Sequence, residues 1–307
     1  MIKPEIYAKG SLTHEQLSVK EAIGCDGLEV QLLNELVADR DKGIYRKASE
    51  VFDLESLKGY NVKVVHAPII KGQGDVTIEV LADDKDIFLL TQIFAIADYF
   101  GKINNRNTIV VLHSEMYYEV MSDIGDTWKR VVTALGGLLN IYSNVEIVIE
   151  NVSPFRGLDN CKQLRLANNF MFDNVDLVKQ LRQSLNTDRI GTCLDTCHAM
   201  LADKYMSIIY KAVDDIPKED LSIDRYFREN KDLIKLVHLS NIEGSGYGKG
   251  KHGIPFNEDT ANKLHSILEL YNKYNYTCPI TLEVEETDYS VSDGYKSTKE
   301  LIDSWYN

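Results

Sequence analysis

Several features are missing from this 307-residue sequence, and each absence excludes a class of protein. No apolar run approaches the roughly 20 residues that are needed to cross a bilayer. The N-terminal residues lack the charged-then-apolar pattern of a signal peptide, so export is not expected. The five cysteines form no regular framework of paired spacings, which indicates reduced thiols. We therefore expect a cytoplasmic protein without a membrane partner.

Positive charge and phosphate-binding glycine motifs are also scarce. The 34 Lys and Arg residues are outnumbered by 47 Asp and Glu residues, which gives a formal net charge of −13. This balance argues against a generally basic nucleic-acid surface but permits a local basic patch. No G-x-G-x-x-G follows the first predicted strand, and the glycine-rich run 244–253 lacks the Lys-Ser/Thr ending of a P-loop. Dinucleotide and nucleoside triphosphate binding are therefore disfavoured.

What is present is a regular alternation of short apolar runs and longer helical segments. The predicted strands cover 5–8, 27–32, 62–66, 108–113, 145–150, 190–195, 234–239 and 280–285. Most are continuous apolar runs, as expected for parallel strands covered on both faces. The clearest predicted helices, with i, i+3, i+4 apolar spacing, cover 84–100, 127–142, 175–185, 259–274 and 294–305. Eight strand–helix repeats favour a (β/α)₈ TIM barrel of the α/β class over an open doubly wound sheet, and we predict a single domain over 1–307.

The stretch 191–198, Gly-Thr-Cys-Leu-Asp-Thr-Cys-His, is the centre of the functional interpretation. It is typical of a buried strand that ends at Asp195, with His198 three residues further on. A tight turn after Asp195 is expected to direct both side chains into one cleft as a pair of metal ligands. Cys193 and Cys197 lack the C-x-x-C spacing of a redox or zinc-ribbon pair, and Cys193 is expected to fill the core.

Other predicted strands end in the same way. The candidate ligands at or just after strand ends are His66, His113, Glu150, Asp195, His198, His238, His252 and Glu283. In a TIM barrel the carboxyl ends of the strands surround the active site. A lone histidine there is explained by core hydrogen bonding, but six successive strands ending in His, Glu or Asp are not explained by packing. Buried carboxylates also need partners to remain charged. The set therefore predicts a divalent-metal site.

The types of ligand narrow the choice of metal. Mixed imidazole and carboxylate ligands suit zinc, manganese, iron or cobalt better than magnesium or calcium. Eight candidates exceed the three or four protein groups that one catalytic zinc uses. Two or three ions, bridged by a carboxylate such as Glu150, are therefore expected. Paired ions suit in-line attack on phosphorus.

The sequence resembles the endonuclease IV / xylose isomerase-like TIM-barrel superfamily over nearly its whole length. The motifs that carry the resemblance are His66-Ala67-Pro68, Leu112-His113, Ile149-Glu150-Asn151, the stretch 191–198, Val237-His238-Leu239, Lys251-His252-Gly253 and Leu282-Glu283. The stretch 191–198 is similar to a signature of the endonuclease IV branch (AP endonuclease family 2). The other motifs are shared with sugar isomerases and epimerases.

The endonuclease IV resemblance implies three zinc ions and cleavage of DNA on the 5′ side of an abasic site. It implies the following ligands: His66, His113 and Glu150 for the first ion, Glu150, Asp195, His238 and Glu283 for the second, and His198 and His252 for the third. Two positions depart from that branch. Gly250 stands where an aspartate is expected beside the last histidine, and Ile69 stands where a DNA-contacting tyrosine is expected.

The isomerase resemblance implies a simpler centre. It places one divalent ion, manganese or cobalt, on Glu150, Asp195, His238 and Glu283. Glu150 and Glu283 would then move a proton between adjacent carbons of a ketose.

Two long loops supply candidate substrate contacts. The residues singled out for substrate binding are Arg156 and Arg165 after the fifth strand, and Tyr247, Lys249 and Lys251 after the seventh. Basic and aromatic side chains on an acidic background suit a phosphate-bearing substrate, DNA included. The leading hypothesis is an endonuclease IV-like phosphodiesterase with Glu150 and Glu283 as catalytic residues. The alternative is a sugar or sugar-phosphate isomerase or epimerase that uses the same two carboxylates.

Overall fold

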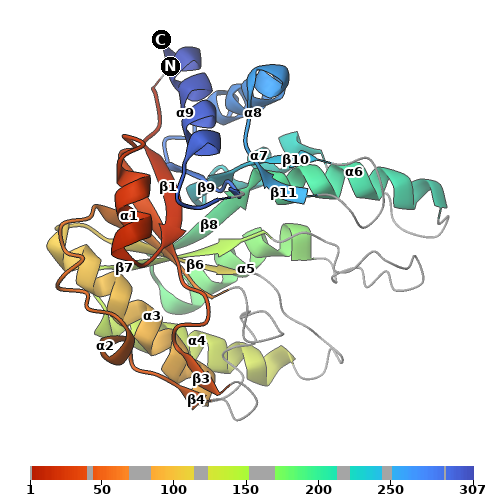
Figure 1. The fold of residues 1–307 in the computed structure, drawn as a ribbon. Helices are drawn as coiled ribbons and strands as arrows, with labels where there is room; N and C mark the ends of the chain where they lie inside the picture. The colour runs from red at the N-terminus through yellow and green to blue at the C-terminus, as the bar shows by residue number, and fades with distance from the viewer. Residues whose placement is uncertain are drawn as a thin grey trace.

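The computed structural model describes residues 2–39, 44–68, 84–113, 124–151, 170–212, 222–243, 251–286 and 288–307. Within these ranges eight parallel strands close into a barrel (Figure 1). In chain order they are β1 Ile6–Ser11, β2 Gly27–Gln31, β5 Val62–His66, β6 Thr108–His113, β7 Val145–Glu150, β8 Ile190–Asp195, β9 Ile234–Leu239 and β12 Ile280–Leu282. Pairing of β1 with β12 closes the barrel, because it joins the first strand to the last.

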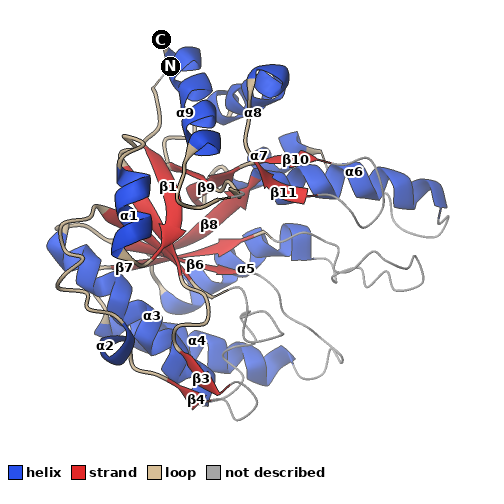
Figure 2. Cartoon of the chain, viewed as in Figure 1, coloured by secondary structure: helices blue, strands red, loops and turns tan. Residues whose placement is uncertain are grey.

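Helices cover the outside of the barrel (Figure 2). They are α1 His14–Glu21, α3 Asp84–Ile103, α4 Ile124–Ile141, α5 Phe170–Leu185, α6 Thr196–Ala212, α7 Ile223–Asn230, α8 Ala261–Lys273 and α9 Asp293–Tyr306, with the short α2 Ala48–Val51 and the 3₁₀ turn Glu258–Thr260. Two hairpins pair β3 Val37–Asp39 with β4 Ile44–Tyr45, and β10 Asn241–Glu243 with β11 Lys251–Ile254. In the ranges given above, none of these helices combines the length and apolar character needed to cross a membrane.

The predicted (β/α)₈ fold is confirmed. The bounds of β5, β6, β7, β8 and β9 are those predicted from the sequence. The first strand continues beyond its predicted end at residue 8 to Ser11, so it includes Lys9. The last strand stops at Leu282, and Glu283 follows it while its backbone N–H still donates to the carbonyl of Leu239 at 3.0 Å. The two hairpins were not predicted.

Side-chain alternation along the strands separates two apolar regions. The smaller region consists of Tyr7, Val64, Ile109, Val111, Val148, Cys193 and Leu236, which share the barrel interior. The larger one includes the intervening strand residues, such as Val110 and Ile147, packed under the helices. Because side chains on a strand repeat every two residues, the residue two positions after an inward one also points inward. Interior Val111 is thus followed by His113, and interior Val148 by Glu150.

A buried lysine lies outside the barrel, on α1. Lys20 is fully buried, and its Nζ lies 3.9 Å from the centre of the Tyr295 ring and 3.4 Å from Ser292 Oγ. Burial lowers the pKa of Lys20 to about 8, although the charge of Glu286 opposes the shift. The buried ammonium therefore joins α1 to α9 and to Ser292, the residue before it.

The stability of the protein is expected to depend on the titration of Lys20. Below about pH 8 both the folded and the unfolded states carry the proton, and burial of the cation opposes folding. Between about pH 8 and the ordinary value of 10.5 the unfolded chain keeps a proton that the folded chain loses, so the free energy of unfolding rises with pH. The difference in that free energy between wild type and Lys20→Met, from urea unfolding at several pH values, should rise over this window by about 1–3 kcal/mol. A flat difference would contradict this interpretation.

Gly191 is expected to be essential to packing at the start of β8. A Cβ atom there would lie 2.6 Å from the carbonyl oxygen of Leu233, and backbone cannot move aside at little cost. Gly191→Ala should lower the free energy of unfolding by about 1–3 kcal/mol, the usual effect of overpacking. The matched control is Gly137→Ala on α4, where nothing lies within 4 Å of the added atom. That change should raise stability by about 0.5–1 kcal/mol in the same urea titration, because alanine favours helix.

Candidate metal centre

Four histidines, three at different strands and one on helix α6, converge on the carboxylate of Glu150 at the end of β7. Glu150 Oε2 lies 3.1 Å from His66 Nε2, 3.6 Å from His113 Nε2 and 3.4 Å from His238 Nδ1. Its other oxygen, Oε1, lies 3.6 Å from His198 Nδ1. Strand register explains part of this arrangement, since His113 and Glu150 are directly paired on neighbouring strands. The predicted convergence at the carboxyl end of the barrel is therefore present.

Three groups of potential ligands among the described residues share Glu150. One consists of Glu150, Cys193 and His238, and the other two contain only imidazole and carboxylate groups. Within each of these two ligand groups the donor atoms lie within 4.8 Å of one another: His66, His113 and Glu150 form the first, and Glu150, Asp195, His238 and Glu283 form the second. Two of the imidazole nitrogens, His113 Nε2 and His238 Nδ1, are buried and have no hydrogen-bond partner among the described residues. Unpaired nitrogens that face carboxylates at this spacing fit the requirements of a divalent transition metal.

Asp195 and His198 are brought together, but not by the predicted turn. Helix α6 begins at Thr196, directly after β8, so the expectation of a tight turn is wrong. Asp195 Oδ1 instead accepts the backbone N–H of His198 at 2.8 Å, because the first N–H groups of a helix have no partner within the helix. The Asp195 Oδ2 atom lies 3.3 Å from His198 Nδ1. The helix start thus fixes both side chains at the barrel mouth.

The Nδ1 atom of His198 lies next to a backbone carbonyl group and two carboxylates. His198 Nδ1 lies 2.9 Å from the carbonyl oxygen of Asn151, so we assign the proton to Nδ1. Ligating histidines commonly donate their second ring N–H to a backbone carbonyl in this way. The side chain of Asn151 also joins the ends of β7 and β8, because it accepts the Asp195 N–H at 2.8 Å and donates to the Asp195 carbonyl at 3.0 Å.

The ionisation of the carboxylates reflects the excess of negative charge at the site. Burial opposes ionisation of Glu150, but His238 and His113 hold its pKa well below the usual range. Burial and the charges of Glu283 and Glu150 raise the pKa of Asp195 well above its usual value. Burial lowers the pKa of His113 to about 3, so this imidazole is neutral and able to bind metal at physiological pH. The negative charges of Glu283 and Glu150 repel an ionised Asp195 and so favour its protonated form. A bound divalent cation would offset this repulsion.

Two charged residues of the site were not predicted from the sequence. Glu29 on β2 is fully buried, and its Oε2 lies 3.0 Å from His238 Nε2. Lys9 on β1 places its Nζ 2.5 Å from Glu283 Oε1 and 3.2 Å from Glu29 Oε1. A signal for both was present, since each is a charged residue within an otherwise largely apolar strand. Lys9 was missed because the first strand was predicted to end at residue 8, directly before it, whereas β1 continues to Ser11.

A cavity of about 460 Å³ adjoins this centre. Residues of β1, β2 and the segment after β12 line it, with Lys9 and Glu283 shared between cavity and centre and with Gln31, Glu285 and Tyr289 around them. The amide of Gln31 is fixed by hydrogen bonds to the carbonyls of Leu32 and Ala67 at 2.9 and 3.0 Å. The cavity therefore has a mostly apolar lining and places a few polar groups close to the candidate ligands, as is typical of substrate sites.

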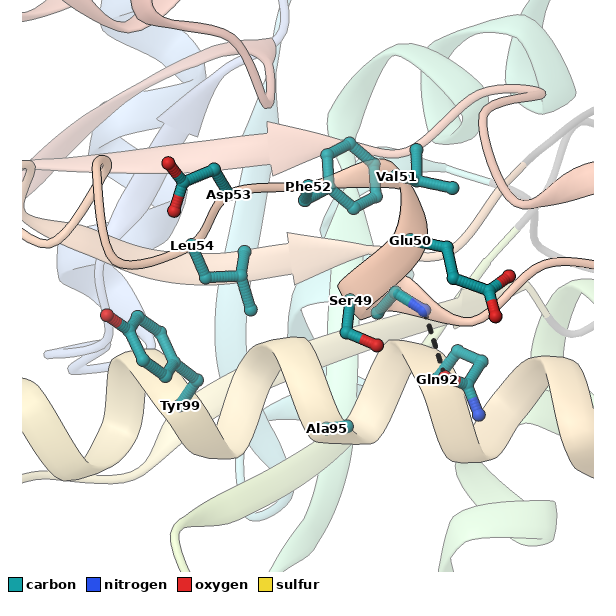
Figure 3. A pocket seen from close by; sticks show the side chains of 10 residues that line it. Ser49, Glu50, Val51, Phe52, Asp53, Leu54, Gln92, Ala95 and Tyr99 are labelled. Atoms are coloured by element: carbon teal, nitrogen blue, oxygen red, sulfur yellow. Dashed lines mark hydrogen bonds between the residues drawn. The ribbon is translucent and has the colours of Figure 1, made fainter.

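A second cavity, of about 740 Å³, lies on the outer surface between α2 and α3 (Figure 3). Phe52 and Leu54 from the segment after α2 and Tyr99 from α3 line it, and the backbone N–H of Ala48 donates to Gln92 Oε1 at 3.0 Å beside it. None of the candidate metal ligands lines this cavity. Its larger volume therefore does not make it the functional site.

Several predicted functional residues fall outside the described part of the chain. These are Arg156, Arg165, Tyr247 and Lys249, together with the two departures Ile69 and Gly250. For Lys251 and His252 only the backbone is described, as part of β11. Their roles remain predictions.

The closed barrel and the imidazole and carboxylate groups at its strand ends define a TIM barrel with a candidate metal centre. Residues 19–305 match the family described as xylose isomerase-like TIM barrel, and the chain belongs to this family. Its superfamily is one of enzymes that include endonucleases, epimerases and isomerases.

Two curated relatives share about a quarter of their residues with the chain. A probable endonuclease 4 of Mycoplasma mycoides subsp. mycoides SC is 26% identical over 231 residues, which cover 73% of this chain and 72% of that protein. A probable endonuclease 4 of Mycoplasma capricolum subsp. capricolum is 26% identical over 185 residues, which cover 58% of each chain.

Among solved structures the fold is similar to an IOLI protein with a bound zinc atom, with a TM-score of 0.57, 16% identity and 99% of each chain covered. An L-ribulose 3-epimerase gives a TM-score of 0.53 and 16% identity over 98% of this chain and 94% of that one.

Loss of the shared carboxylate is expected to disrupt metal binding. Because Glu150 belongs to both ligand groups, Glu150→Gln should weaken zinc affinity by about 100-fold or more, measured by competition with a chromophoric chelator. The matched control is Glu146→Gln on the same strand, whose Oε2 pairs with Lys235 Nζ at 2.6 Å away from the centre. Equal zinc affinity in the Glu150→Gln protein and the wild type would refute the assignment of Glu150 as a shared ligand.

Proposed function

We propose that this protein is a divalent-metal-dependent phosphodiesterase resembling endonuclease IV, with zinc as its metal. The observation that carries the proposal is the position of Glu150, which belongs to both groups of ligand atoms. A carboxylate shared by two ions is the arrangement expected of a two-metal site. When bound, two such ions would stabilise both the attacking and the leaving oxygen of a displacement at phosphorus. The two endonuclease 4 relatives support the same class of reaction.

The residues of the chain would hold this arrangement rigid before substrate arrives. His66 Nδ1 lies 2.7 Å from the carbonyl of Ala67, and donation of its proton there aims Nε2 at Glu150. The Asn151 amide holds the Asp195 backbone, and thereby the start of α6. Glu283 faces both the centre and the adjoining cavity, so it would contact substrate and ligand atoms at once. Preorganised groups of this kind need little rearrangement during reaction.

The proposed substrate is a phosphodiester, with abasic-site DNA as the member of that class suggested by the relatives. The basic and aromatic residues Arg156, Arg165, Tyr247, Lys249 and Lys251 are proposed to contact its phosphates. Phosphate contacts of this kind weaken as salt rises, because bound counterions are released on binding. The net charge of −13 makes such local contacts necessary for any DNA substrate.

A sugar isomerase or epimerase is the second candidate, and the cavity beside Glu283 favours it. Among the described residues that line this cavity, Lys9 is the only cation, and its ammonium is engaged by Glu29 and Glu283. Glutamate, glutamine and tyrosine side chains supply the other polar groups, which suits hydroxyl groups better than phosphate. Glu150 and Glu283 also lie 3.4 and 3.3 Å from the same nitrogen of His238, so the two carboxylates of the proposed proton relay around one manganese or cobalt ion lie close together.

Metal content and substrate assays distinguish the two candidates. Protein purified without chelator should contain two or more zinc ions per chain and should cleave a duplex with one abasic site, leaving the intact duplex uncut. A single exchangeable manganese or cobalt ion, with turnover of ketoses and no cleavage of the duplex, would overturn the phosphodiesterase. Glu150→Gln should lower the rate of cleavage by at least about 100-fold, whereas Glu146→Gln should retain it.

A further inference from the structure

We propose that Lys9 and Glu29 form a buried ion pair that positions His238 and Glu283 for metal binding. We call this pair the Lys9–Glu29 brace. It comes from β1 and β2, the two strands of the barrel that contribute none of the predicted ligands. The inference rests on the metal centre of the proposed function, but it does not depend on which reaction the centre performs.

Glu29 fixes the orientation of the His238 ring. Its Oε2 lies 3.0 Å from His238 Nε2, and both side chains are fully buried. A carboxylate accepts only, so the proton of this contact lies on Nε2 of the histidine. The opposite nitrogen, Nδ1, then faces Glu150 at 3.4 Å and Glu283 at 3.3 Å. Carboxylate–histidine contacts of this kind orient metal ligands and raise their basicity.

Lys9 restricts the carboxylate of Glu283 to one oxygen. Lys9 Nζ lies 2.5 Å from Glu283 Oε1, while the other oxygen, Oε2, lies near His238 Nδ1. The backbone of Lys9 is itself held, because the Tyr295 hydroxyl donates to its carbonyl at 2.8 Å. Glu283 would therefore offer a metal one oxygen rather than two.

Barrel closure brings the members of the brace together. Lys9 and Glu29 are directly paired between β1 and β2. On the other side of β1, Ala8 pairs with Leu282, which places Lys9 beside Glu283. The Lys9 ammonium therefore lies between two carboxylates, 3.2 Å from Glu29 Oε1 and 2.5 Å from Glu283 Oε1.

Zinc affinity and the visible spectrum of the Co²⁺-substituted protein test the brace. Glu29→Gln should weaken zinc binding by about 10–100-fold, the usual effect of removing a group that orients a ligand. Lys9→Met should weaken the visible Co²⁺ absorption, because Glu283 is then free to bind through both oxygens and raise the coordination number. Matched controls are Glu146→Gln and Lys235→Met, which alter a similar ion pair away from the centre and should leave both readouts unchanged.

The double variant Lys9→Met/Glu29→Gln separates positioning from charge. It has the same net charge as the wild type. If the single variants weaken zinc binding only through their change of charge, the double variant should bind zinc with wild-type affinity. If orientation of His238 matters, zinc affinity stays at least about 10-fold weaker than in the wild type. Wild-type zinc affinity and an unchanged Co²⁺ spectrum in the double variant would overturn the brace.

Two further measurements keep the test decisive. Should Glu29→Gln fail to fold, Glu29→Asp keeps the charge and shortens the side chain, and zinc binding should again weaken by about 10-fold or more; unchanged affinity would overturn the brace. If the brace variants weaken zinc binding as expected but the wild-type protein cleaves no phosphodiester, only the proposed function is refuted. Wild-type protein that takes up no divalent metal would refute both.

Discussion

The burial of four carboxylates at one end of a closed barrel is the constraint on which the rest of this structure depends. Glu29, Glu150 and Asp195 are almost completely buried, and Glu283 is only slightly exposed at the wall of a cavity. Isolated buried charges are too costly to persist, so each carboxylate must have a cation or a hydrogen-bond donor. Lys9 and the surrounding imidazoles meet part of this requirement, and a divalent cation would meet the remainder. The candidate metal centre is thus also a condition for charge balance in the core.

The barrel makes this arrangement possible because its strands are parallel and in fixed register. All the carboxyl ends meet at one mouth, and the two-residue period of a strand sends every second side chain inward. His113 therefore lies beside Glu150, and Asp195 beside His238, as direct partners on adjacent strands. The same period places an apolar layer beneath the polar one, and this layer excludes water from the floor of the site.

The candidate ligand set is compatible with two kinds of chemistry. Glu150, Asp195, His238 and Glu283 are compatible with one ion and proton transfer, whereas His66 and His113 add a second group on the other side of Glu150. The number of ions bound is therefore the property that separates phosphodiester cleavage from isomerisation. A Lys9 ammonium beside Glu283 adds a fixed positive charge on the β1 side, where it would oppose binding of a further cation.

The sequence by itself determined the barrel and the convergence of its strand-end residues. An apolar run followed by His, Glu or Asp is a local pattern, and parallel strands must bring such ends together, so the grouping of His66, His113 and Glu150 could be predicted. The start of α6 at Thr196 could not, because helix and turn compete closely after a strand. Only the tertiary structure revealed the Lys9–Glu29 brace. The meeting of Lys9 with Glu283 depends on pairing between the first and last strands, and this contact between distant parts of the chain leaves no local pattern in the sequence.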